Sequence, residues 1–214
     1  MSDLKTQIRA ARDERETGDP KKALEMFLEI DKSQLDPNQV FDYLGELGLT
    51  YWHLKDYPKA RTTFEEALAY AEKTNNKSYS AVALRHLARP EFNSESPDNA
   101  VSLARQARDL AFEAGRQDLA WFDHGVVTTL IFNKASFDEI KKWFDIEAED
   151  LYNTSRNTKD DIAKWVWTCG LLIDRSHVFD SIADLYIALM IAEQFNLARR
   201  KEQIEEMISK FNNK

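Results

Sequence analysis

Residues 44–72 read LGELGLTYWHLKDYPKARTTFEEALAYAE, and they carry the clearest structural pattern in the chain. A small residue, Gly48, is followed twelve positions later by Ala60 and four positions further on by Phe64. A small residue near the middle of one helix lets the next helix approach closely, and an aromatic ring on that next helix closes the gap. The stretch therefore predicts two helices packed as a hairpin.

The same pattern recurs along the chain. The small position of each unit is occupied, in turn, by Ala11, Gly48, Ala88, Thr128 and Gly170, so successive units are 37, 40, 40 and 42 residues apart. A repeat of about 20 to 50 residues is typical of stacked supersecondary units. We expect five helical hairpins and one final helix, over residues 3–31, 38–74, 77–114, 117–153, 159–195 and 197–212.

The composition favours the same class. The 214 residues include only 6 Gly and 5 Pro, too few to supply the turns of a strand-rich fold. Asp19-Pro20 and Ser96-Pro97 are typical helix starts, and Gly115 is suited to end a helix. The final helix has an apolar stripe with polar residues elsewhere, which predicts a cap on the stack. Its basic run, Arg199 to Lys201, is interpreted as a solvated face.

Residues 44–72 resemble a tetratricopeptide repeat at nine positions: Leu44, Leu47, Gly48, Tyr51, Asp56, Tyr57, Ala60, Phe64 and Ala67. The first and fifth units keep parts of the pattern, whereas the third and fourth are degenerate. Spacings near 40 residues exceed the usual value of about 34 and are similar to the longer variants in kinesin light chains and Rap-type bacterial pheromone receptors. The resemblance implies an all-α, right-handed superhelical solenoid of about five hairpins, forming a single domain over residues 1–214 with a C-terminal capping helix.

Charge limits the classes of partner. Lys and Arg total 29 against 37 Asp and Glu, a net charge of −8 with a pI near 5.1. This charge opposes attraction to nucleic acid and to anionic membranes, so we expect neither partner. No apolar run is long enough to span a bilayer and no secretory signal opens the chain, which favours a cytoplasmic location. A single cysteine, Cys169, excludes an intramolecular disulfide and is expected in the core.

No motif for chemistry is evident. The histidines, His53, His86, His124 and His177, are far apart in sequence, and none has a second ligand at a metal-binding spacing. A phosphate-binding glycine loop and a nucleophile elbow are also absent from the sequence. We therefore expect no catalytic residues, no metal and no cofactor. An enzyme on a helical scaffold remains an alternative, and it would need His53, His86 and a carboxylate to converge in space.

The resemblance also implies a binding face. In tetratricopeptide arrays the first helix of each hairpin lines the concave surface, at positions three before, one after and four after the small residue. These positions are Ile8, Arg12, Arg15, Gly45, Leu49, Trp52, Arg85, Arg89, Phe92, Gly125, Thr129, Phe132, Trp167, Leu171 and Asp174. Arginine pairs at helical spacing suit carboxylate or phosphate groups, and large aromatic residues suit apolar anchors. The alternative is that these arginines pair with neighbouring hairpins and that the tryptophans are core.

We therefore predict a non-catalytic interaction module, such as an adaptor, scaffold or co-chaperone-like protein, that binds a peptide or protein segment in the groove. The ligand would carry acidic and aromatic or apolar side chains. The predicted groove residues are Arg12, Arg15, Gly45, Trp52, Arg85, Arg89, Phe132 and Trp167. The second alternative is a peptide-sensing regulator of the pheromone-receptor type. Homodimer formation is left open.

Overall fold

The computed structural model describes residues 3–17, 19–89, 97–157 and 161–213, and every regular element in these ranges is a helix. The predicted all-α class is confirmed. The elements, in chain order, are α1 (Leu4–Thr17), α2 (Pro20–Leu28), the short 3-10 helix η1 (Lys32–Gln34), α3 (Pro37–His53), α4 (Tyr57–Lys73), α5 (Lys77–Leu87), α6 (Pro97–Glu113), α7 (Leu119–Phe132), α8 (Phe137–Asn157), α9 (Asp161–Phe179), α10 (Ile182–Gln194) and α11 (Ala198–Asn212).

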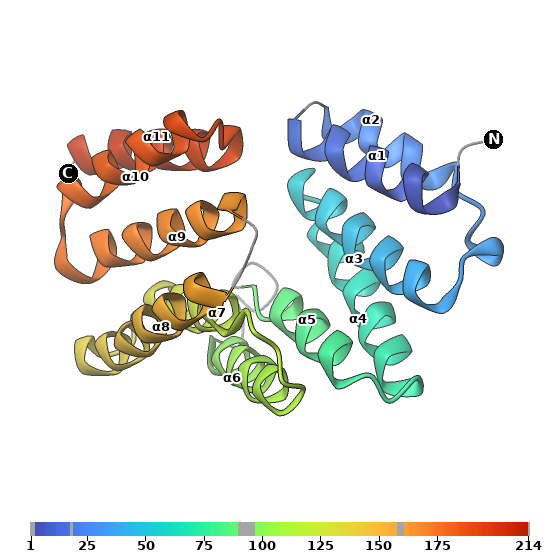
Figure 1. Ribbon diagram of the computed structural model, residues 1–214, viewed down its shortest axis with the longest axis horizontal. Coiled ribbons are helices and arrows are strands. Elements are labelled where there is room, and N and C mark those ends of the chain that lie inside the picture. The colour runs from blue at the N-terminus through green and yellow to red at the C-terminus, as the bar shows by residue number, and fades with distance from the viewer. Residues whose placement is uncertain (1–2, 18, 90–96, 158–160, 214) are drawn as a thin grey trace.

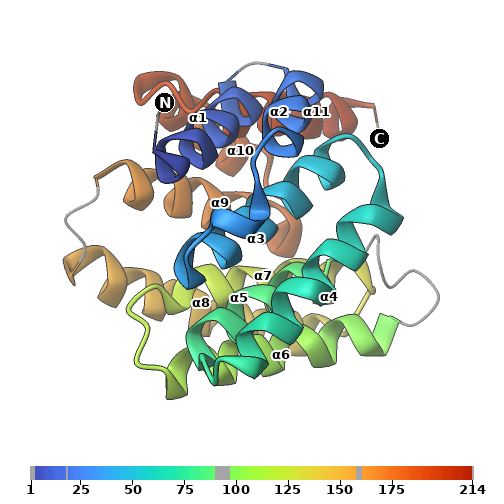
Figure 2. The same cartoon turned by 90° about the vertical axis from the view of Figure 1, so that its right-hand side faces the viewer.

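Consecutive helices pack in pairs, from α1 with α2 to α9 with α10, and each pair packs on the next. The stack curves so that its helices surround a central space as an incomplete ring (Figure 1). The first hairpin lies at the upper right and the last at the upper left of Figure 1, both lie at the top of Figure 2, and α11 contacts α1 directly. The two ends of the solenoid are therefore in contact.

Helix starts are defined by short polar side chains. Asp19, Asp56 and Asn76 each accept a hydrogen bond from a main-chain N–H of the helix that follows. Asp36 forms a capping box with Gln39 at the start of α3. Such caps satisfy main-chain donors that have no partner inside the helix. They explain why these helices begin where they do.

Helix ends explain the scarcity of glycine. Gly115 follows α6 with φ of +68°, which confirms its predicted role. The equivalent left-handed position after α3, α4, α7, α9 and α10 is instead filled by Lys55, Asn75, Lys134, Asp180 and Asn196. A residue with a side chain accepts this conformation at a cost of about 1–2 kcal/mol. The turns therefore need few glycines.

The small-and-aromatic register is clearest in the second unit. A Cβ atom at Gly48 would lie 2.5 Å from the Phe64 ring, so only glycine fits there. In the fifth unit the register changes. Tyr186 is 48% exposed, and the space beside Gly170 is filled by Arg200 and His124 instead. This replacement brings charged side chains into the centre of the molecule.

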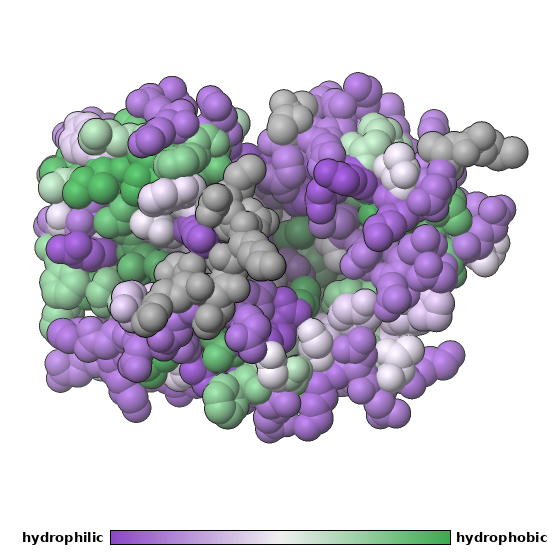
Figure 3. Space-filling model, viewed as in Figure 1, coloured by the Kyte–Doolittle hydropathy of each residue, from purple (hydrophilic) through white to green (hydrophobic). Residues whose placement is uncertain are grey.

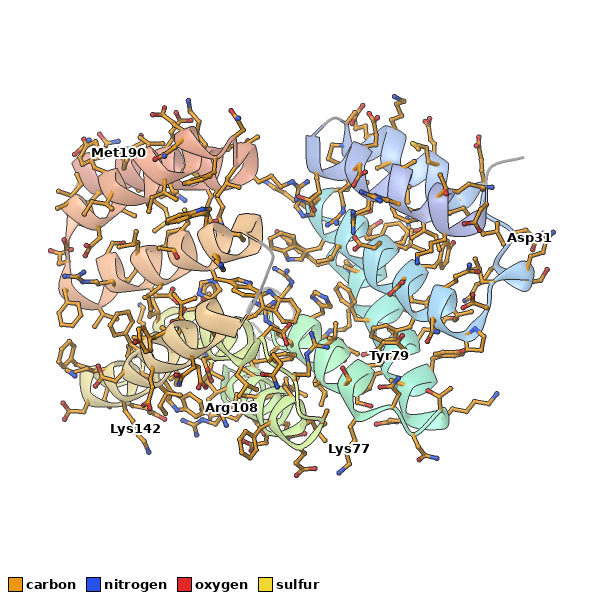
Figure 4. All side chains as sticks on the ribbon, viewed as in Figure 1. Asp31, Lys77, Tyr79, Arg108, Lys142 and Met190 are labelled. Atoms are coloured by element: carbon orange, nitrogen blue, oxygen red, sulfur yellow. The ribbon has the colours of Figure 1, made fainter. Side chains whose placement is uncertain are left out.

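The surface is largely hydrophilic and is hollowed near the middle of the molecule (Figure 3). Apolar side chains are exposed mainly on the outer edge of the last hairpins, where Met190 lies (Figure 4). No helix in the described residues is long and apolar enough to cross a membrane. The Pro90 interruption and the predicted groove residue Phe92 lie outside the described residues.

Candidate functional site

The interior of the superhelix is the candidate site, and its first wall is α1. The side chain of Arg12 is 43% exposed and pairs with Asp13 at 3.1 Å. Arg15 is buried and forms ion pairs with Glu16 at 2.8 Å and with Glu46 of α3. Burial raises the pKa of Glu46, and the Arg15 guanidinium opposes that rise. Arg12 is therefore accessible at the surface, whereas Arg15 is already paired.

Two glycines and one aromatic residue of the predicted groove differ in their surroundings. A Cβ atom at Gly45 would meet nothing within 4 Å. At Gly125 it would lie 3.4 Å from the Arg85 side chain, so Gly125 packs against that arginine. Phe132, at the end of α7, is 57% exposed. The open spaces in this region are therefore beside Gly45 and Phe132.

Two arginine and tryptophan stacks line the centre. The guanidinium carbon of Arg85 lies 3.6 Å from the centre of the Trp121 ring, and its Nε donates to the main-chain oxygen of Trp121 at 2.8 Å. The guanidinium carbon of Arg89 lies 4.1 Å from the Trp52 ring. Burial lowers the pKa of Arg85, and Arg89 and Arg200 lower it further. The positively charged side chains of Arg85, Arg89 and Arg200 therefore lie close enough to repel one another.

A small cavity of about 10 Å³ adjoins the first stack. It has room for about one water molecule. Its wall includes two indole rings, an imidazole, a carboxylate and a guanidinium, from Trp121, Trp167, His124, Glu147 and Arg200. Trp167, a predicted groove residue, therefore lies at this cavity together with His124, Glu147 and Arg200.

Three titratable groups meet beside this cavity, and we call them the His124 cluster: His124 of α7, Glu147 of α8 and Asp174 of α9. His124 Nδ1 lies 2.6 Å from an Asp174 carboxylate oxygen and 3.6 Å from a Glu147 oxygen. Burial alone would lower the pKa of His124, but Asp174 and Glu147 outweigh it and raise the pKa to about 9. Burial raises the pKa of Glu147, and the nearby Asp174 adds to that rise.

A second set of contacts, which we call the latch, joins α11 to α1. Arg199 donates from Nη2 to the main-chain oxygen of Arg15 and from Nε to that of Glu16 at 3.2 Å. It also pairs with the Glu16 carboxylate at 2.8 Å and contacts a ring nitrogen of His53 at 2.7 Å. The acceptors are carbonyls in the last turn of α1, which have no partner inside the helix. Arg199, a residue of α11, therefore caps the C-terminal end of α1.

The histidines named for an enzyme do not converge on a carboxylate within the described residues. His53 contacts Arg199, and burial together with the nearby Arg199 lowers the pKa of His53 to about 3. His86 stacks on Phe64, with ring centres 4.7 Å apart. The cluster that does form involves His124, a histidine that the sequence analysis treated as isolated.

Sequence reasoning missed His124, Glu147, Arg199 and Arg200 as interior residues. Arg199 and Arg200 were interpreted as a solvated face, whereas both lie inward. A signal was present for Arg200, because it stands four residues before Ile204, the fully buried residue of α11, and so shares its face. No local signal marked His124 and Glu147, since their partners come from other hairpins.

The curved stack of helix pairs around a shared interior defines a helical repeat solenoid. Residues 39–113 match the sequence model of the tetratricopeptide repeat family. Among solved structures, the chain is similar to the nearly identical TPR-like repeats of a Podosopora anserina protein described as a kinesin light chain, and to a point variant of those repeats. The two comparisons give TM-scores of 0.59 and 0.60 at 16% identity, and each covers 94% of this chain and 96% of the other. No curated protein sequence matches the chain.

The predicted resemblance is therefore confirmed for the second and third hairpins, which match the tetratricopeptide repeat model. The solved structures extend the fold to nearly the whole chain. Tetratricopeptide repeats generally mediate interactions between proteins.

Proposed function

We propose that the interior of the superhelix binds a peptide or protein segment that carries acidic groups and large apolar side chains. The arginine and tryptophan stacks, Arg85 on Trp121 and Arg89 on Trp52, are the main support. A guanidinium held over an indole ring keeps N–H groups for other partners, and guanidinium groups bind carboxylates in a bidentate manner. The proposed contact residues are Arg12, Gly45, Trp52, Arg85, Arg89, Phe132 and Trp167; Arg15, also predicted from the sequence, is buried and paired with Glu16 and Glu46.

The distribution of charge supports an acidic ligand. The protein has a net charge of −8, yet Arg85, Arg89 and Arg200 lie close to one another in the interior. Among the described residues, Arg85 and Arg200 have no carboxylate within 4 Å. A buried charge without a close counter-charge is costly. Glu147 acts on both guanidinium groups without a direct ion pair, and an acidic segment would supply that direct pairing.

The test selects binders from a displayed library of random 15-residue peptides against the full chain. We expect enrichment of Asp and Glu together with Trp, Phe or Leu. Glutamine is the replacement of choice at Arg85 and Arg89, because it removes the charge without burying an acid. The selected peptides should bind the Arg85→Gln and Arg89→Gln double variant at least about tenfold more weakly, as expected for lost charge-assisted hydrogen bonds.

The matched control is the Arg9→Gln and Lys210→Gln double variant, which removes two largely exposed cations outside the stacks. It should bind the peptides as the unchanged chain does. Equal binding by a folded Arg85 and Arg89 double variant would rule out the arginine role, and enrichment of basic peptides would contradict the proposal as a whole.

A second candidate, a peptide-sensing regulator, is favoured by the latch. Arg199 links the two ends of the solenoid, so a ligand that enters the interior and displaces it would change the curvature of the stack. Small-angle scattering with and without a selected peptide separates the two candidates. A change in radius of gyration at saturation supports a sensor, whereas an adaptor keeps the same radius.

A further inference from the structure

The His124 cluster joins three helices at one point. His124, Glu147 and Asp174 each offer one ligand atom, and these atoms lie within 4.8 Å of one another. The residues come from α7, α8 and α9, which belong to two neighbouring hairpins. An imidazole and two carboxylates from separate elements are thus directed toward a shared point.

One atom of the cluster lacks a hydrogen-bond partner. Glu147 is only 2% exposed, and among the described residues its Oε2 has no hydrogen-bond partner. Buried carboxylate oxygens are almost always hydrogen-bonded or bound to a cation, because an unsatisfied one forfeits its hydration. The nearby Asp174 carboxylate cannot donate in its ionised form. A further electrophile, either a proton or a metal ion, is therefore expected beside Glu147.

The donor set suits a transition metal. Zn²⁺ binds imidazole nitrogen at about 2.0–2.1 Å and carboxylate oxygen at about 2.0–2.2 Å. Three ligand atoms around one such ion are separated by roughly 3–3.5 Å. Side-chain movements that shift the ligand atoms by about an ångström would bring the present atoms, which lie within 4.8 Å of one another, to that separation. A neutral imidazole and two carboxylates carry two negative charges, which balance a divalent ion.

The adjoining cavity provides the remaining coordination position. His124 and Glu147 both line it, and its volume of about 10 Å³ accepts about one water molecule. Three protein ligands plus one water complete a tetrahedral site. Gly170 also lines the cavity, and a Cβ atom there would lie in ordinary van der Waals contact with the imidazole, 3.6 Å away.

We propose that His124, Glu147 and Asp174 bind a single Zn²⁺ ion that ties α7, α8 and α9 together. The role of the ion is structural: it holds the wall of the interior that carries Trp121 and Trp167. None of the three ligands is a proposed peptide contact, although Trp167 and Arg200 line the adjoining cavity, so Zn²⁺ binding is measured without peptide and tests the ion alone.

The experiment uses the full chain without a histidine tag, stripped with a chelator and titrated with Zn²⁺ by calorimetry. We expect one ion per chain and a rise in melting temperature with Zn²⁺, because an ion that binds the folded state alone stabilises it. Glu147→Gln keeps the size of the side chain and should weaken Zn²⁺ binding at least about tenfold. Glu149→Gln, on the exposed face of the same helix, is the matched control and should bind as the unchanged chain does.

Absence of stoichiometric Zn²⁺ binding by the folded chain would overturn the proposal and leave a shared proton as the occupant of the cluster. Equal Zn²⁺ affinity in the Glu147→Gln and Glu149→Gln variants would also overturn it, because the ion would then be bound elsewhere. Mg²⁺ in place of Zn²⁺ should give no comparable binding, since Mg²⁺ prefers an all-oxygen shell and the cluster supplies a nitrogen.

Discussion

Arg199, near the start of the last helix, donates a hydrogen bond to the main-chain oxygen of Arg15 in the first helix. The two residues are 184 positions apart. Most contacts in a repeat stack join neighbouring units, so a bond between its two ends gives the solenoid a closed form that the individual repeats do not require.

The latch predicts how the ends of the molecule respond to its loss. Arg199→Ala removes a charged donor from the last-turn carbonyls of α1, which should lower the free energy of unfolding by about 1.5–3 kcal/mol. The amide protons of α1 should exchange faster in the variant. Urea denaturation and hydrogen exchange measure the two effects. The control is Lys201→Ala, which removes an exposed pair with Glu193; if it affects α1 equally, the latch is not the cause.

Two glycines of α3 should respond in opposite directions to the same substitution. Gly48→Ala forces a methyl group against the Phe64 ring, 2.5 Å away, and overpacking of this kind costs about 1–3 kcal/mol. Gly45→Ala adds a methyl group where nothing lies within 4 Å, and it should raise stability by up to about 1 kcal/mol because alanine favours the helix. Denaturant unfolding of the two variants checks the prediction, which fails if both change stability in the same direction.

A buried ion-pair network should make Arg108 important for stability. Arg108 of α6 lies 3.0 Å from Asp123 and 3.0 Å from Asp150, and Asp123 is fully buried. Figure 4 shows Arg108 on the side of the molecule where α6 and α8 lie. Arg108→Leu leaves a buried carboxylate without its counter-charge, so we expect a loss of about 3–5 kcal/mol in denaturant unfolding.

Two further variants test this explanation. Adding Asp123→Asn to Arg108→Leu removes the uncompensated charge and should recover part of the loss. Arg105→Leu, on the same helix, breaks an exposed pair with Glu139 and should cost only about 0–1 kcal/mol. Equal losses for Arg105→Leu and Arg108→Leu would show that burial of the pair is not the decisive factor.

His53 should make the protein sensitive to acid. Burial, and then the positive charges of Arg199 and Arg15, lower the pKa of His53 from 6.5 to about 3. The unfolded chain therefore binds a proton between these values that the folded chain does not. Stability from this source is present above pH 6.5 and falls as the pH decreases, by about 1.4 kcal/mol per pH unit.

Urea denaturation between pH 7 and pH 5 measures this slope. His53→Gln keeps a hydrogen-bond acceptor for Arg199 and removes the titration, so its stability should fall less steeply with decreasing pH. His177→Gln replaces an exposed histidine and should keep the slope of the unchanged chain. An unchanged slope in His53→Gln would refute the assignment.

The concave positions show how far the repeat pattern reaches. The pattern predicts Arg85, Trp167 and Asp174 as concave positions, and all three lie at the centre of the molecule. The same rule named Ile8 and Thr129, which are buried in helix packing. The difference arises because the width of the exposed strip depends on the angle between successive hairpins, which the pattern does not contain.

The sequence by itself determined the helices, their pairing and the tight contact of Gly48 with Phe64. These features depend on residues within one hairpin, where capping, spacing and side-chain size act locally. Only the tertiary structure decided which residues share the interior. The curvature of a repeat stack is the sum of small rotations between units, and no single motif encodes that sum. Accumulated over five hairpins, it brings Arg199 to Arg15 and gathers His124, Glu147 and Asp174 at one point.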